Sequence, residues 1–148
     1  MQVPRRSSVA ELAVGRRLPR VCMNSDSSAA IAQAEALIAS GDEAKLWEGA
    51  ALLGEFASAE PEAIWPIVLR FASSDDAEIR MAIACCVLEH ILEHHFEPYF
   101  AESQRLIAAG NPQFAATFSS CWDFGQTEQP ENKRRFNELV QHIRTQNA

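Results

Sequence analysis

The sequence predicts an all-α fold, arranged as a short right-handed α-α superhelix of about three helix pairs with one N-terminal capping helix. The first observation is an internal repeat, because residues 42–53 resemble residues 75–86 at an offset of 33. Residues 114–121 resemble residues 79–86 at an offset of 35. The second observation is that apolar residues follow helical spacing after Ser28, without strand-like alternation. Since one helix pair cannot bury its apolar face without a neighbour, a repeat of this length predicts stacked helix pairs.

The first two helices are predicted from their end signals. Residues 28–40 form the first helix, and Gly41 is the kind of residue that commonly follows the last helical turn. Asp42 predicts the N-cap of a second helix, which extends to about Ser58. Its predicted buried positions follow helical spacing: Leu46, Ala50, Leu53 and Ala57.

The third and fourth helices occupy the middle of the chain. Pro61 predicts the start of the third helix, where the missing proline N–H is harmless, and Pro66 leaves open a start further downstream. Asp75 or Asp76 caps the fourth helix. Residues 81–88 are apolar nearly all round, which predicts a helix buried on several sides in the middle of the stack. The apolar positions of the third helix are Ile64, Trp65, Val68, Leu69 and Ala72.

Three further helices complete the predicted array. Pro98 opens the fifth helix, which ends at Gly110, and Asn111 caps a sixth helix that ends near Gly125. Residues 126–130 are predicted as a loop before the seventh helix. That helix has one apolar stripe, which is typical of a terminal helix with one wet face: Phe136, Leu139, Val140 and Ile143. We expect the second helix to pair with the third, the fourth with the fifth and the sixth with the seventh.

The N-terminal segment differs from the rest of the chain in charge. Residues 1–23 have a net charge of +4, whereas the remaining residues have −11, which together give the −7 of the whole chain. We interpret residues 1–23 as a disordered basic extension, or as the result of a start that truly lies at Met23. The helical-repeat domain then covers residues 24–148. Because this body is acidic and repels the phosphate backbone, we expect no general nucleic-acid binding.

One stretch resembles a known family. Residues 75–80, Asp-Asp-Ala-Glu-Ile-Arg, precede the alanine-rich apolar residues 82–88, and together they resemble the HEAT-repeat signature. Trp47 stands where the better copy has Arg80. The resemblance implies an α-α superhelix whose second helices line a concave, protein-binding face, and it specifies fold better than function. It extends with decreasing quality over three segments: 74–110, 42–73 and 111–146.

The sharpest chemical motif lies at the end of the fourth helix. His90, Glu93 and His94 share one helix face with Glu97, and imidazoles four residues apart converge well enough to bind zinc. The string also fits the His-x-x-Glu-His pattern of zinc peptidases. A catalytic zinc needs a third protein ligand, and the only other histidines are His95 and His142. We therefore interpret the motif as a solvated helix end, and keep a metal-dependent hydrolase as the alternative.

Other chemistries have less support in the sequence. HEAT-like DNA glycosylases need a basic groove with aromatic residues, and here Trp65 and Trp122 are interpreted as core residues of an acidic body. The residues Ser119 to Trp122 are interpreted as a packed helix face. The four cysteines lack zinc-ligand spacing, so we expect buried, reduced thiols in the cytoplasm. No cofactor is expected, and no apolar run reaches the length of a membrane span.

The sequence therefore predicts a non-catalytic protein-interaction module or small scaffold, with a HEAT-like DNA-repair domain as the least favoured alternative. The partner is expected to be a protein with a basic or mixed-charge surface. On the expected pairing, the third, fifth and seventh helices line the concave side. Their polar positions are the predicted partner-binding residues: Glu62, Arg70, Glu102, Arg105, Arg134 and Glu138.

Overall fold

The computed structural model describes residues 25–147, and within this range it contains helices and turns but no strand. The all-α prediction is confirmed. The interpretation of residues 1–23 as a basic extension lies outside the described residues. The elements in chain order are α2 (Ser25–Ile38), α3 (Glu43–Gly54), α4 (Pro61–Ala72), α5 (Ala77–Ile83), η2 (Ala84–Leu88), α6 (Glu89–His94), α7 (Phe96–Ala108), α8 (Pro112–Ser119), η3 (Gly125–Glu128) and α9 (Pro130–Gln146).

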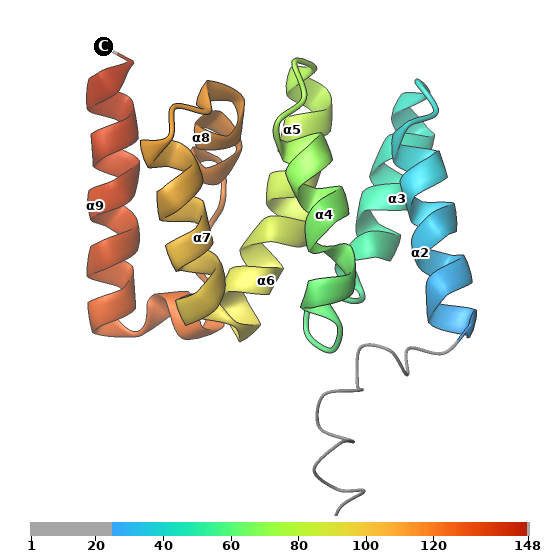
Figure 1. The fold of residues 1–148 in the computed structure, drawn as a ribbon, viewed down its shortest axis with the longest axis horizontal. Helices are drawn as coiled ribbons and strands as arrows, with labels where there is room; N and C mark the ends of the chain where they lie inside the picture. Colours follow the sequence, from blue (N-terminus) through green and yellow to red (C-terminus); the bar gives the residue numbers. More distant parts are fainter. Residues whose placement is uncertain (1–24, 148) are drawn as a thin grey trace, which may run out of the picture.

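The helices form two layers. In Figure 1, α2, α4 and α7 lie on the viewer's side, α3, α5 and α8 lie behind them, and α9 closes the end opposite α2. The predicted pairing differs from the observed contacts. The helix α3 packs most extensively on α2, and then on the continuous helix formed by α5, η2 and α6, which we call the central helix, rather than on α4. Gly49 allows this contact, since a Cβ there would lie 2.8 Å from the backbone oxygen of Ala34 in α2.

The core follows the predicted apolar positions. The side chains of Leu46, Ala50, Leu53 and Ala57 are all buried, as their spacing predicts. Phenylalanine rings then connect α7, α8 and α9, with centroid distances of 4.8, 6.2 and 5.0 Å between successive rings. Aromatic pairs at such distances add to the free energy of simple burial. The four rings of this chain are Phe96, Phe100, Phe118 and Phe136.

Side chains cap three helix starts at the predicted residues. Asp42 accepts from the backbone N–H of Lys45, and Asp76 accepts from that of Glu78. Asn111 caps α8 through the N–H of Phe114, at 2.9 Å. Each cap satisfies one of the N–H groups that a helix start leaves without an internal acceptor.

Several predicted boundaries are wrong by a few residues. The second helix ends at Gly54 rather than near Ser58, because the chain continues in tighter turns in which the N–H of Ala57 bonds the carbonyl of Gly54. The fifth helix starts at Phe96, so Pro98 lies in its first turn, where its missing N–H costs no hydrogen bond. Pro66 lies inside α4, which continues through it, although the missing N–H leaves the carbonyl of Glu62 without its helical donor.

The central helix contains a π-helical segment that the sequence did not predict. The elements α5, η2 and α6 form one continuous helix from Ala77 to His94. Within it, the N–H of Glu89 bonds the carbonyl of Ala84, five residues earlier. The segment packs against Gly54, where an added Cβ would lie 2.0 Å from the carbonyl oxygen of Cys86. Only a glycine in α3 leaves room for this carbonyl. Single π-helical turns within α-helices are frequent at functional sites.

Candidate functional site

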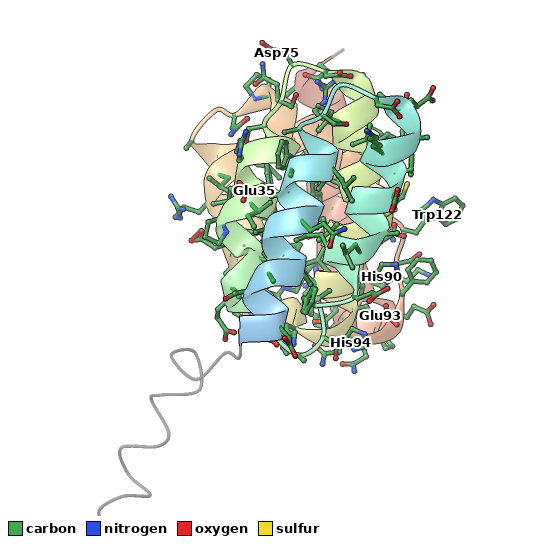
Figure 2. All side chains as sticks on the ribbon, turned by 90° about the vertical axis from the view of Figure 1, so that its right-hand side faces the viewer. Glu35, Asp75, His90, Glu93, His94 and Trp122 are labelled. Carbon is green, nitrogen blue, oxygen red and sulfur yellow. The ribbon has the colours of Figure 1, made fainter. Side chains whose placement is uncertain are left out.

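Three large apolar side chains are exposed among the described residues. The exposed fractions are 67% for Trp122, 43% for Met81 and 37% for Phe124. All three lie along the central helix: Met81 contacts the thiol of Cys85, the ring of Phe124 stacks on His90, and the backbone N–H of Trp122 bonds Glu89, the residue before His90. We call the surface formed by Met81, Cys85, His90, Trp122 and Phe124 the aromatic face. Trp122, His90, Glu93 and His94 gather on the side of the molecule that carries α3 (Figure 2).

Trp122 is exposed because it lies in the loop that follows the last residue of α8. The helix stops at Ser119 rather than near Gly125, and the hydroxyls of Ser119 and Ser120 bond carbonyls four residues back. The N–H of Trp122 then donates to the Glu89 carboxylate, at 2.8 Å, instead of continuing the helical ladder. The interpretation of Ser119 to Trp122 as a packed helix face is wrong for Trp122, although Cys121 is buried.

Glu89 is the buried group that holds this loop. Its residue is only 5% exposed, and burial raises the pKa of its carboxyl, while the N–H of Trp122 opposes that shift. Burial also raises the pKa of the Cys85 and Cys86 thiols, with the Glu89 charge acting in the same direction. The pKa of Cys121 is raised still further. These thiols are therefore protonated at neutral pH and are poor nucleophiles.

His90, Glu93 and His94 come together as their spacing predicts. The prediction that Glu97 shares this face is wrong, because α6 ends at His94 and Glu97 lies in the first turn of α7, where it pairs with Arg135 of α9. The Nδ1 atom of His90 lies 2.8 Å from Oε1 of Glu93, and Nε2 of His94 lies 3.8 Å from the same oxygen. Gly125 fixes Glu93 from the other side, because a Cβ there would lie 2.5 Å from the Glu93 Cγ. Both imidazoles therefore face a carboxylate whose side chain packs against Gly125.

The described residues contain no group of three or more His, Cys, Asp and Glu side chains arranged to hold a metal ion. His142, which the sequence leaves as a third histidine, lines a groove between α7, α8 and α9 and not the aromatic face. His95 is used elsewhere, since its Nε2 lies 2.6 Å from the carbonyl oxygen of Ser58. The geometry thus supplies no third ligand for the hydrolase alternative.

An open groove of about 470 Å³ lies along the contact between α3 and the central helix. Its floor consists of small side chains, and its lower end carries His90 and His94. Among the described residues, Glu55, which directly follows α3, is the only carboxylate that lines it, and no lysine or arginine does so. The upper end is bridged by Trp47, whose indole N–H donates to Glu78 at 3.0 Å. The lining residues are Ala51, Gly54, Glu55, Ala57, Ser58, Cys85, Cys86, His90 and His94.

The predicted partner-binding residues lie on α4, α7 and α9, and most of them are paired with neighbours. Arg70 bonds Glu35 of α2 at 2.8 Å, and Arg105 bonds Glu102 on its own helix. Arg134 contacts both Glu131 and Glu138. Glu62 is exposed on α4 without an ion pair among the described residues. This side of the molecule therefore presents charges that already neutralise one another.

The sequence did not identify Trp122, Phe124 and Glu89 as site residues. The turn signal of Gly125, which has a φ of +52°, predicted a helix end after Trp122, and no local signal marked the observed end at Ser119. Trp65, in contrast, is partly buried as predicted and packs on Tyr99 with ring centroids 4.8 Å apart. A groove without basic side chains does not fit the DNA-repair alternative.

No helix of the described part combines the length and the apolar character that crossing a bilayer requires. No protein-family model, no curated protein and no solved structure matches this chain. The candidate site therefore rests on its own geometry: a fixed loop that exposes Trp122 and Phe124 beside a groove lined by small side chains, two histidines and one glutamate.

Proposed function

We propose that this protein is a non-catalytic protein-interaction module, a small α-solenoid of HEAT type that binds its partner through the aromatic face. The single observation that carries this proposal is the exposure of Trp122, at 67%, on a loop that buried groups hold in place. Exposed apolar patches mark interaction sites, and tryptophan is enriched among the residues that dominate binding free energies.

The loop around Trp122 is held on both sides. The N–H of Trp122 bonds buried Glu89, and Asp123 forms an ion pair with Lys133 of α9, at 3.1 Å. The side chain of Gln126 bridges the corner between α6 and α7, accepting from the N–H of Phe96 and donating to the carbonyl of His94. A surface that is already ordered loses less conformational entropy when a partner binds, which favours affinity.

Two structural features support the HEAT-type solenoid. The helices form two layers in sequence order, as expected for stacked helix pairs (Figure 1). The residues that resemble the HEAT signature also stabilise its turn, because Asp76 caps the helix and Arg80 donates to the carbonyl oxygen of Ser74, at 2.8 Å.

The surroundings of the aromatic face favour binding over catalysis. The neighbouring thiols of Cys85 and Cys86 have raised pKa values, and Glu93 is shared between two imidazoles. Cys85, Cys86 and Cys121 are free thiols, which agrees with a reducing, cytoplasmic setting. Binding of a protein partner needs none of these groups to react.

The test is a comparison of affinity purifications from the native host with three baits of the full chain. The wild type is compared with Trp122→Ala and with Glu102→Ala/Arg105→Ala, which removes one exposed ion pair on α7 and keeps the net charge. We expect a set of proteins that the wild type and the double variant both capture and that Trp122→Ala loses. Identical protein sets for all three folded baits would refute the proposal.

A further inference from the structure

We infer that the groove between α3 and the central helix receives a basic amphipathic helix of the partner. This inference rests on the proposed function and specifies the chemistry of the partner. The groove continues into the aromatic face, because His90 lines the groove and also stacks on Phe124, with ring centroids 6.0 Å apart. One ligand can therefore occupy the groove and contact Phe124 and Trp122 together.

The floor of the groove allows a helix to approach closely. Ala51, Gly54 and Ala57 come from the α3 side, and Cys85 and Cys86 come from the central helix. Small side chains at a helix–helix contact let the backbones approach and let ridges of one helix enter the groove of another. From Cys86 to His94 the central helix rises roughly 12 Å, at about 1.5 Å per residue, which matches about two turns of a bound helix. Helix-in-groove recognition uses an apolar face of this kind.

The charge around the groove favours a cationic ligand. Glu55, which directly follows α3, lines the groove, and Glu48 is exposed on α3 three residues before Ala51. Neither glutamate forms an ion pair within the described residues. Lys45, the one basic residue of α3, lies three residues before Glu48 and six before Ala51, so it neighbours Glu48 rather than the groove. A partner helix with lysine or arginine beside its apolar face would neutralise these carboxylates.

The aromatic side chains add a second contact for a cation. Trp122 is 67% exposed, and Phe124, whose ring stacks on His90 at the groove, is 37% exposed. Arginine and lysine side chains are attracted to the faces of aromatic rings, and tryptophan gives the strongest attraction. Basic residues on both flanks of the ligand helix are therefore expected, one set facing α3 and the other facing Trp122.

The test uses a displayed library of peptides about 15 residues long, the length at which isolated helices begin to be stable. The full-length wild-type protein is the target. We expect the selected peptides to carry lysine or arginine on both sides of an apolar stripe. Their binding should weaken at least about tenfold with Glu55→Arg, and further as salt concentration rises.

The matched control is Asp26→Arg, a charge reversal at an exposed position on α2, away from the groove. Binding equal to wild type is expected for this variant. Neutral or acidic selected peptides, equal losses for Glu55→Arg and Asp26→Arg, or no selected peptide at all would overturn the inference. A dimer in sedimentation that Trp122→Ala dissociates would assign the groove to a second copy of the chain and would also overturn it.

These outcomes are separate from those of the purification experiment. If the captured host proteins depend on Trp122 but not on Glu55, the proposed interaction function stands and the basic-helix inference fails. If neither residue matters for the captured proteins, the proposed function itself fails. The two variants can be compared in one experiment because both positions are exposed and both substitutions leave the core unchanged.

Discussion

The two sides of the molecule distribute their side chains in opposite ways. On the side of α4, α7 and α9, arginines are paired with glutamates, as in Arg70–Glu35 and Arg105–Glu102. On the side of α3 and the central helix, Trp122 is exposed and the carboxylate of Glu55 has no ion-pair partner among the described residues. Surface ion pairs contribute little free energy and are replaced easily by water. The comparison indicates that charged residues alone are a poor guide to a binding surface.

The two sides also differ in what holds them in place. Exposed glutamates of the paired side, such as Glu102, have a lowered pKa because an arginine donates to them. Glu89 beneath the aromatic face has a raised pKa because it is buried. One side is therefore stabilised by weak contacts in solvent, and the other by a buried carboxyl, a π-helical segment and a glycine contact. Substitutions should affect stability unequally on the two sides.

The largest effect is expected for Gly54→Ala. The new Cβ would lie 2.0 Å from the carbonyl oxygen of Cys86, so α3 and the central helix must move apart. We expect a loss of about 3 kcal/mol in the free energy of unfolding. Ala51→Ser, on the same helix but exposed to the groove, is the control and should lose less than about 1 kcal/mol. Denaturant unfolding followed by circular dichroism measures both, and equal stabilities would show that the close contact is absent.

A smaller loss is expected for Glu89→Ala. The substitution leaves the N–H of Trp122 without its buried acceptor, which costs about 2 kcal/mol. Glu89→Gln keeps an acceptor oxygen and should lose clearly less. The tryptophan fluorescence spectrum reports the loop, and we expect it to change in Glu89→Ala alone. If Glu89→Ala unfolds at the same denaturant concentration as the wild type, the carboxylate does not hold this loop.

The pH dependence of stability should differ between the two sides. Because the folded-state pKa of Glu89 is raised, its contribution is fully present below the ordinary glutamate pKa of 4.5 and is lost as pH rises through the raised value. Glutamine mimics the protonated form, so Glu89→Gln should gain stability relative to the wild type as pH rises from about 4 to 7.

The contribution of Glu102 to stability changes with pH in the opposite direction, because the pKa of its carboxyl is lowered. Its contribution is present above pH 4.5 and is lost as pH falls, so Glu102→Gln should approach wild-type stability in acid. Denaturant unfolding curves of Glu89→Gln and Glu102→Gln between about pH 4 and 7 test both predictions. Parallel pH profiles for the two variants would contradict the assignment.

The smallest effects on stability are expected for Trp122→Ala and Arg105→Ala. Trp122 is 67% exposed, so its removal should change the unfolding free energy by less than about 1 kcal/mol. Arg105 lies in solvent, and its loss should leave thermal unfolding unchanged. The two variants should then separate only in partner binding, which Trp122→Ala weakens. A large destabilisation by Trp122→Ala would indicate that the ring packs on the fold.

The sequence by itself determined the all-α class, the capped starts at Asp42, Asp76 and Asn111, and the apolar stripes that form the core. These features depend on local rules, namely helical periodicity and side-chain bonds to neighbouring N–H groups. The motif formed by His90, Glu93 and His94 was equally local, because residues three and four apart share a helix face.

Only the tertiary structure decided which side chains form the aromatic face. The exposure of Trp122 depends on Glu89, which is 33 residues away in the chain and takes over the N–H that would otherwise extend α8. The π-helical segment depends on Gly54, which leaves space for the carbonyl of Cys86. Both contacts join distant segments, and periodicity within one helix carries no information about the partner that a backbone group finds in another.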